Sequence, residues 1–197
     1  MNPAQKFDKA VTISKGLVVT DISKLRVVSE PLKTRHGVKA VVEKIKEAMK
    51  HTWVDGVGLT AIQIGIPKRI AYLKFDDGQE VTLINPVITK FSGDLLLEKE
   101  GCLSIPDAWT PVVRNSEITV IVDGLNGKER VFTNFKARAI QHEIDLMDGI
   151  LNIDKKAKLI KKRHTNTTPG EDRSNRYKKR RDKAKAQKKS RKKNRKK

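Results

Sequence analysis

A His-Glu pair in the C-terminal half of the chain has the residue types needed for metal-assisted hydrolysis. In the helical pattern H-E-x-x-H, two imidazoles lie one turn apart and ligate one metal, while the Glu serves as general base. His142 and Glu143 occupy the first two positions of that pattern, and Leu146 stands where the second His belongs. Leucine has no lone pair to donate to a metal. The sequence therefore leaves open whether a metal binds at this site.

Two earlier segments carry groups that fit the same chemistry. Residues 56–63 read G-V-G-L-T-A-I-Q and end in the amide of Gln63, and residues 100–104 read E-G-C-L-S and contain Cys102, the only cysteine. Each signal is weak when taken singly, because a lone cysteine is usually a small buried apolar residue and G-x-G marks only a loop.

The three segments, in this order, resemble the peptide deformylase family, which carries G-[VI]-G-L-[AS]-A-x-Q, E-G-C-L-S and Q-H-E-x-D-H. The first two are reproduced almost completely, with Thr60 where the family has Ala or Ser. The resemblance extends from about Leu25 to Asp154. It includes Leu25-Arg26, Pro31, Arg69, Asn85-Pro86, Arg114 and Ala137-Arg138.

This resemblance implies a metallohydrolase that removes the formyl group from N-formyl-methionine of nascent polypeptides. Its divalent metal would be Fe²⁺, with Zn²⁺, Ni²⁺ or Co²⁺ as alternatives, and Cys102 and His142 map onto two of its three ligands. Glu143 maps onto the general base. The side-chain amide of Gln63 and the backbone N–H of Leu103 map onto the donors that hold the oxyanion of the attacked formyl group.

Leu146 leaves several interpretations open. In the first, the site has two ligands and binds metal weakly or not at all, and the chain is an impaired pseudo-deformylase. In the second, Asp145, three residues after His142, turns inward and is the third ligand. In a third interpretation, Leu146 is an introduced change or an error in a working enzyme. The remaining candidate ligands are His36, His51 and His164.

Glycine and apolar residues of the first two segments are candidates for substrate binding. Gly56 and Gly58 would let the backbone come close to the substrate peptide, as glycine permits. A pocket for methionine is expected from Leu59, Ile62 and Ile105, although core packing explains these three equally well.

Two amphipathic helices and several strands must position these groups. Apolar side chains recur at helical spacing over residues 37–52 and 136–147. Arg138 and Asp145 lie about two turns apart on the second helix, where the simplest expectation is a structural ion pair. The expected strands are 69–75, 79–84, 87–91, 117–122 and 129–135. Without regular βαβ alternation, this order favours an α+β domain, with antiparallel sheets around the central His-Glu helix as the resemblance implies.

The net charge of +20 is concentrated at the C-terminal end of the chain. Residues 155–197 hold 22 of the 43 lysines and arginines and only three acids, whereas the preceding part is nearly neutral. Such a dense run of like charge is expected to lack a fixed structure on its own. We therefore expect an N-terminal extension over 1–20, a deformylase-like domain over 21–160 and a basic low-complexity tail over 161–197.

The tail predicts salt-sensitive, sequence-independent binding to RNA phosphates. Tyr177 is its only aromatic residue, which argues against a base-stacking reader. A tether to ribosomal RNA fits a protein acting on nascent chains; a solvated tail and a nuclear address are the alternatives. The candidate RNA-binding residues are Lys178, Lys179, Arg180, Arg181, Lys188, Lys189, Arg191, Lys192 and Lys193.

The single cysteine excludes an internal disulfide and favours a reducing, cytoplasmic setting, whether in a bacterium, a phage-infected host or an organelle. No run approaches the roughly 20 apolar residues of a membrane helix. The expected partners are the nascent N-formyl-methionyl peptide and the ribosome, and the expected state is a monomer. The competing hypotheses are a pseudoenzyme that binds ribosome or nascent chain without chemistry, and a general RNA-binding module carried by this domain.

Overall fold

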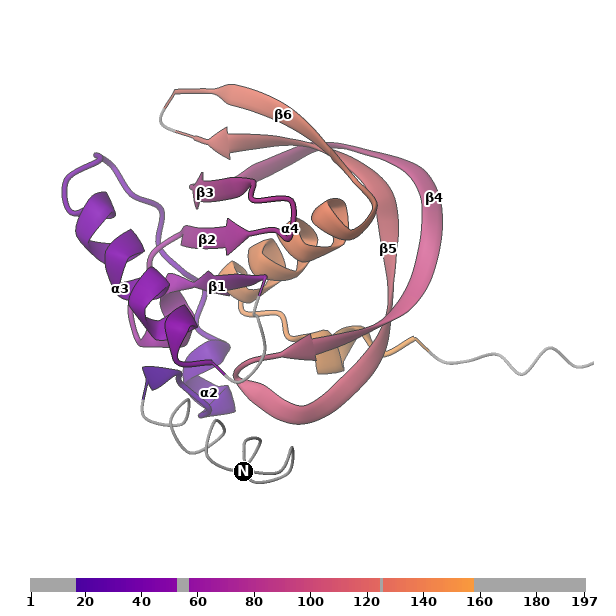
Figure 1. Ribbon diagram of the computed structural model, residues 1–197, viewed down its shortest axis with the longest axis horizontal. Helices are drawn as coiled ribbons and strands as arrows, with labels where there is room; N and C mark the ends of the chain where they lie inside the picture. The colour runs from indigo at the N-terminus through magenta and orange to yellow at the C-terminus, as the bar shows by residue number, and fades with distance from the viewer. Residues whose placement is uncertain (1–16, 53–56, 125, 158–197) are drawn as a thin grey trace, which may run out of the picture. The chain divides into compact units, whose positions relative to one another are not determined.

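The computed structural model describes residues 17–52, 57–124 and 126–157 (Figure 1). Gly56, the tail over 161–197 and its candidate RNA-binding residues lie outside this part. The helices are α2 (Ile22–Leu25), α3 (Val38–Lys50) and α4 (Asn134–Met147), and the 3₁₀ turns are η1 (Ala61–Ile64) and η2 (Asn152–Lys155). The strands are β1 (Gly58–Thr60), β2 (Ile70–Lys74), β3 (Glu80–Ile84), β4 (Val87–Cys102), β5 (Ile105–Asp123) and β6 (Lys128–Thr133).

The strands form one sheet in the order β1-β2-β3-β5-β4, with β6 paired to β5. Every pair runs antiparallel except β3 and β5, which meet in parallel only at Ile84 and Asp123. β4 and β5 form a long curved hairpin with three register irregularities, at Ile88/Lys90, Ser92/Leu95 and Glu100/Cys102. Such irregularities bend and twist a strand pair, which accounts for the curvature of β4 and β5 in Figure 1.

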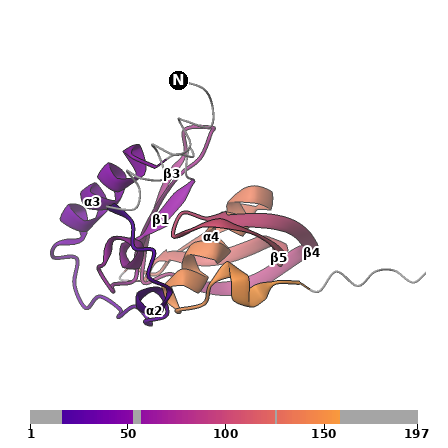
Figure 2. The same cartoon turned by 90° about the horizontal axis from the view of Figure 1, so that it is seen from below.

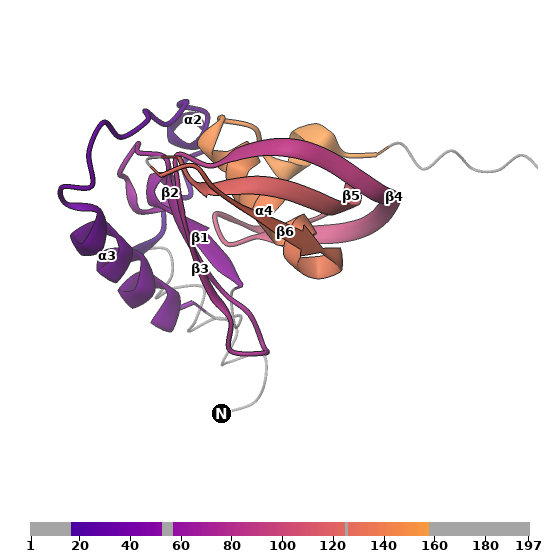
Figure 3. The ribbon, with the colours of Figure 1, turned by 90° about the horizontal axis from the view of Figure 1, so that it is seen from above.

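Helix α3 covers one face of the β1–β3 strands and α4 lies against the other (Figures 2 and 3). Because side chains alternate along a strand, β2 supplies both faces. Ile70 and Tyr72 pack with the helix residue Ile45 of α3, whereas Ala71 and Leu73 join the cluster that includes α4. The β2 strand is therefore buried on both sides.

Helix α4 is the central element, since β1–β3 lie on one side of it and β4 and β5 curve around the other (Figure 1). Ile140, Ile144 and Met147 lie in one cluster with side chains of β2, β3, β5 and β6. The helix is followed by Gly149 at φ +72°, where a Cβ would stand 2.5 Å from the carbonyl oxygen of Arg26. Both the backbone angle and this close approach require glycine at the helix end.

The α+β fold with a central His-Glu helix is confirmed, and both predicted helices match α3 and α4 within two residues. Val18, assigned from sequence to the N-terminal extension, is buried with the α3 cluster, and Val19 donates from its N–H to the Gln63 carbonyl at 2.7 Å. At the other end, Lys156 forms an antiparallel bridge with Val112 of β5. Among the described residues, no helix is long and apolar enough to cross a membrane.

Candidate active site

A cavity of about 260 Å³ opens where β1, the β4–β5 hairpin and α4 meet. It brings together the three sequence segments that were singled out for their chemistry. Its polar lining consists of Gln63, Lys99, Glu100, Cys102, Arg138, His142 and Glu143, and its other walls consist of Val57, Gly58, Gly101, Leu103, Pro106, Trp109, Phe135 and Ala139.

Cys102 is placed by the tip of the long hairpin. It is the last residue of β4 and pairs with Ile105, the first residue of β5, so that Leu103 and Ser104 form a two-residue turn. The cysteine is only 7% exposed but lines the cavity. The turn also brings Leu103, the expected source of a backbone oxyanion donor, to the cavity wall.

Gln63 is oriented by hydrogen bonds at both ends of its amide. The Oε1 atom accepts from the backbone N–H and from the hydroxyl of Thr60, each at 2.9 Å. The Nε2 atom then faces the hairpin tip, donating to Ser104 Oγ at 3.1 Å and to Cys102 Sγ at 3.7 Å. Thr60, the one departure in the first motif, therefore helps to point the amide donor toward the cysteine.

His142 lies between a thiol and a carboxylate. Its Nδ1 atom is 3.2 Å from Glu100 Oε2, and the ring also hydrogen bonds to Cys102. Burial alone would lower the pKa of His142, but the hydrogen bonds to Cys102 and Glu100 outweigh burial and raise it to about 10.

Glu100 is the centre of a buried ion-pair network. Arg114 donates to both of its oxygens at 2.9 Å, and Arg138 Nη1 donates to Oε1 at 2.6 Å. Burial would raise the pKa of Glu100, yet the hydrogen bonds from Arg114 and His142 hold it well below its usual range. Asn152 of η2 supports the same residue, since its Nδ2 donates to the Glu100 carbonyl at 3.0 Å.

Glu143 has an unsatisfied carboxylate oxygen in the cavity wall. The residue is only 4% exposed, and no described group forms a hydrogen bond with its Oε2. A Cβ at Gly58 would stand 2.6 Å from Oε1, so glycine is what makes room for this carboxylate. Burial raises the pKa of Glu143 to about 7, which suits a group that both takes and returns a proton at neutral pH.

Leu146 occupies the third-ligand position as a core residue. It is only 1% exposed and clusters with Leu25, Cys102 and Leu151. Within the described ranges, no group of three or more His, Cys, Asp or Glu side chains is placed to hold a metal ion. The residues here supply two donors, Cys102 and His142, and do not fit a catalytic metal with three protein ligands.

Asp145 does not replace the missing ligand, contrary to one of the expectations. Its carboxylate pairs with Arg114 and with Lys155, the latter at 2.7 Å. Arg138 likewise forms structural ion pairs, through Nε with Glu98 at 2.9 Å and through Nη1 with Glu100. Both residues have structural ion pairs, formed with side chains outside their own helix.

Of the histidines considered as substitute ligands, His36 and His51 are described, and neither lies in the cavity wall. His36 and His51 are exposed, and His51 Nε2 lies 3.1 Å from Glu47 Oε1. His164 lies outside the described residues.

The three residues expected to form a methionine pocket, Leu59, Ile62 and Ile105, do not line this cavity. Leu59 and Ile62 are buried, Leu59 in the cluster under α3, and Ile105 packs against the Leu146 cluster. Gly58 does reach the cavity, but its neighbour there is the Glu143 carboxylate rather than open space for a peptide.

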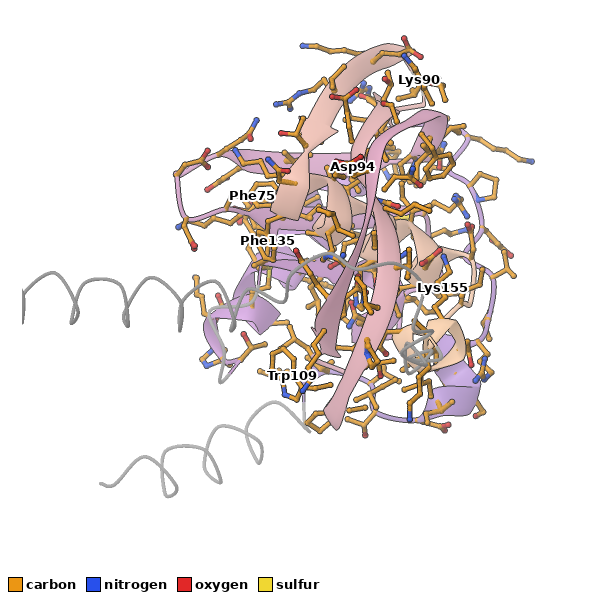
Figure 4. The ribbon with its side chains drawn as sticks, turned by 90° about the vertical axis from the view of Figure 1, so that its right-hand side faces the viewer. Phe75, Lys90, Asp94, Trp109, Phe135 and Lys155 are labelled. Atoms are coloured by element: carbon orange, nitrogen blue, oxygen red, sulfur yellow. The ribbon has the colours of Figure 1, made fainter. Side chains whose placement is uncertain are left out.

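Aromatic side chains form the apolar walls that the sequence reasoning missed. Trp109 and Phe135 both line the cavity and are more than half exposed, and both lie on the left of β4 and β5 in Figure 4, with Lys155 on the right. Phe135 and Ala139 precede His142 by seven and three residues, so helical periodicity already placed them on its face. Trp109 had no comparable signal.

Comparison with known proteins agrees with this geometry. The sequence model of polypeptide deformylase matches residues 15–162. The peptide deformylase of Halothermothrix orenii is 42% identical over 156 residues, which cover 77% of this chain and 90% of the relative. The solved peptide deformylase of Thermotoga maritima aligns with TM-score 0.65 at 31% identity, covering 72% of this chain and 97% of that one.

A second solved structure is a Met-Ala-Ser-bound class I type b peptide deformylase from Acinetobacter baumannii. It aligns with TM-score 0.62 at 28% identity and covers 71% of this chain and 96% of that one. The alignment over nearly the whole length of these proteins, together with the three motifs gathered in one cavity, shows that the chain belongs to the polypeptide deformylase family.

Proposed function

We propose that this protein removes the formyl group from N-formyl-methionine at the start of nascent polypeptides. The observation that carries the proposal is the unsatisfied oxygen of Glu143, held in one cavity with Gln63 and Cys102. The similarity to a deformylase bound to Met-Ala-Ser supports a peptide that begins with methionine. The exposed aromatic walls, Trp109 and Phe135, offer apolar surface for the methionine side chain.

In this proposal the polar groups of the cavity either act on the formyl group or hold the residues that do. Glu143 takes a proton from the water that attacks the formyl carbon and returns it to the leaving amine as the carbon–nitrogen bond breaks, which releases formate. Gln63 Nε2 and the Leu103 N–H stabilise the oxyanion, and one such donor contributes roughly 3 kcal/mol to lowering the barrier. The Glu100 network keeps His142 and the hairpin tip in place.

Peptide deformylases are metalloenzymes, but the residues of this chain do not complete their ligand set. A divalent ion, Fe²⁺ or in its place Zn²⁺, Ni²⁺ or Co²⁺, would find two protein donors beside buried Leu146. The proton transfers above are therefore assigned to this chain's own side chains. Metal content per chain after anaerobic purification measures directly whether an ion is retained.

The test is formate release from formyl-Met-Ala-Ser, with Fe²⁺ and with a chelator. The matched control is Glu143→Gln, which has nearly the same volume but cannot take a proton. We expect formate from the wild-type chain and a loss of about a hundredfold or more in the control. A wild-type rate equal to that of the control under both conditions would contradict the proposed function.

We further propose that the basic tail binds ribosomal RNA and so keeps the protein near the ribosome. In this proposal the protein is a monomer and acts in the cytoplasm. The support is its charge: residues 161–197 hold 19 lysines and arginines against three acids. Deleting residues 164–197 should remove most RNA affinity and flatten the dependence of the binding constant on salt concentration. Equal RNA affinity with and without these residues would refute the tether, whatever the outcome of the formate assay.

A further inference from the structure

The cavity has a buried polar floor and an exposed mouth of a different character. The floor is formed by buried side chains of the three motifs, among them Gln63, Cys102 and Glu143. The exposed lining residues include Lys99 and Trp109 of the β4–β5 hairpin. A peptide whose first residue reacts at the floor must pass through this mouth. The mouth is therefore where the residues that follow the first one are contacted.

Lys99 carries an unpaired positive charge at this mouth. The other lysine or arginine of the lining, Arg138, is only 6% exposed and pairs with Glu98 and Glu100. The Lys99 side chain is exposed and forms no ion pair or hydrogen bond with any residue in the described part of the chain. Its two acidic neighbours in sequence face the opposite side of β4, because successive strand residues alternate. A negatively charged group on a bound molecule would therefore find Lys99 available.

Trp109 adds an apolar surface to the same mouth. A Cβ at Gly101 would stand 3.3 to 3.4 Å from three atoms of the six-membered ring of the indole, so the indole lies directly against the β4 backbone. Trp109 is nevertheless 59% exposed. Gly101 and Lys99 are two residues apart on β4 and lie on one face of the strand. The mouth thus combines apolar surface with one positive charge.

Strand geometry indicates which part of a peptide Lys99 can reach. Lys99 precedes Cys102 by three residues on β4, which is a separation of about 10 Å at the usual rise of a strand. An extended peptide advances about 3.3–3.6 Å per residue. A group about 10 Å from the reacting end therefore belongs to the second or third residue of the peptide.

We propose that Lys99 makes this protein selective for nascent chains that carry an acidic side chain directly after the methionine. This proposal rests on the deformylase function proposed above and names the class of peptide that the same cavity prefers. Lys99 determines specificity and takes no part in breaking the carbon–nitrogen bond. Its pair with Asp or Glu is exposed to solvent, so the preference is modest and weakens as salt screens the charges.

The experiment compares three substrates that differ only in the charge of their second and third residues. They are formyl-Met-Asp-Asp-amide, formyl-Met-Asn-Asn-amide and formyl-Met-Lys-Lys-amide. The terminal amide is needed because a terminal carboxylate would itself pair with Lys99. The full-length chain is supplied with Fe²⁺, and kcat/KM for formate release is measured for each peptide at low and at high salt.

Wild type is compared with Lys99→Met, Lys99→Glu and a matched control, Lys90→Glu. Lys90 is also an exposed lysine of β4, does not line the cavity, and lies at the opposite end of the hairpin from Trp109 in Figure 4. Lys90→Glu therefore changes the net charge as much as Lys99→Glu does. Every variant keeps the basic tail, so a general attraction of acidic peptides to the charge of +20 is common to all.

We expect the wild type to prefer the Asp-Asp peptide to the Asn-Asn peptide by about fivefold at low salt, and by less at high salt. Lys99→Met should lower this preference, Lys99→Glu should reverse it in favour of the Lys-Lys peptide, and Lys90→Glu should retain it. The same preference in wild type and Lys99→Glu would overturn the proposal. A reversal that Lys90→Glu reproduces would overturn it as well.

Failure of this proposal is distinguishable from failure of the deformylase function. The same three peptides without the formyl group cannot be turned over, so calorimetry on the same chains gives their dissociation constants whether or not formate is released. Formate release without dependence on Lys99 would refute the charge preference alone. No formate, with dissociation constants that follow the charge of residue 99, would refute the deformylase function and support the charge preference. No formate and no dependence of binding on Lys99 would refute both.

Discussion

Cys102 separates two regions of unlike chemistry. On one side Glu100 is held by Arg114, Arg138 and His142, all in a buried network of charged hydrogen bonds. On the other side Leu146 packs with Leu25 and Leu151 in a cluster free of charge. Leu146, at the position where the sequence resemblance implies a third metal ligand, is therefore part of the apolar core.

The two regions are stabilised by different interactions. Each charge in the network needs its partner, because an ion left buried without one loses its hydration and gains nothing in return. The apolar cluster depends on filled volume and tolerates no unpaired polar group. A change should therefore be most costly in the charged region, and Leu146 should be replaceable by histidine only when a metal satisfies the new side chain.

The largest effect is expected for Glu100→Ala. It leaves two buried guanidinium groups and His142 without their shared acceptor, and we expect a loss of about 3–5 kcal/mol of unfolding free energy. Urea unfolding followed by circular dichroism measures it. Glu98→Ala is the matched control, because Glu98 also pairs with Arg138 but is 54% exposed, and about 1 kcal/mol or less is expected. Equal losses in both variants would contradict a special role of burial.

Leu146→His should lose about 2–4 kcal/mol in the presence of chelator, since an imidazole replaces a fully buried leucine. Added Zn²⁺ should restore about 2.7 kcal/mol at a hundred times its dissociation constant. Unfolding with and without Zn²⁺ tests this, and Leu146→Ala, which creates a cavity but no ligand, should not respond to the ion. Wild-type protein that responds to Zn²⁺ as strongly as Leu146→His would show that two ligands suffice.

Gly58→Ala tests the close approach of Gly58 to the Glu143 carboxylate. The added methyl group would lie 2.6 Å from Glu143 Oε1 and 3.0 Å from Leu73 Cγ, so we expect a cost of about 1–3 kcal/mol and a displaced carboxylate. A double-mutant cycle with Glu143→Ala separates the two contacts. If the cost of Gly58→Ala is the same with and without the Glu143 carboxylate, the clash lies with Leu73 alone.

The smallest effect is expected for Thr60→Val, which keeps the shape and removes the hydroxyl donor to Gln63 Oε1. The backbone N–H of Thr60 still donates to the same oxygen, so the loss should be about 1 kcal/mol. Thr60→Ser retains the hydroxyl and should behave as wild type in urea unfolding. A full loss in the serine variant would assign the effect to the methyl group instead.

The fold was predictable wherever hydrophobic spacing was regular. The periodic apolar residues of α3 and α4 and the Asp-Asp-Gly turn between β2 and β3 gave elements close to those observed. The full lengths of β4 and β5 were not predictable, because bulges interrupt the alternation of β4 and most of its side chains are exposed. Local patterns do not contain the curvature that such a hairpin acquires by wrapping a helix.

The candidate site was predictable in its polar groups but not in its walls. The motif residues Gln63, Cys102, His142 and Glu143 do meet in one cavity. Leu59 does not line the cavity because successive residues of a strand face opposite sides of the sheet. Gly58 faces Glu143, so its neighbour Leu59 faces α3. That Asp145 pairs with Arg114 depends on contact between α4 and β5, which spacing along one helix does not show.

The way the chain leaves the domain has a mechanical consequence. Ala157 donates to the Pro111 carbonyl at 2.8 Å, Lys156 bridges Val112, and Lys155 pairs with Asp145. A pulling force on Ala157 would load these bonds one after another rather than all together. Each would therefore open at a low force. The ion pair of Asp154 with Arg26 would be loaded next, and after it the bond from Asn152 to the Glu100 carbonyl, where tension would reach the residues around Cys102.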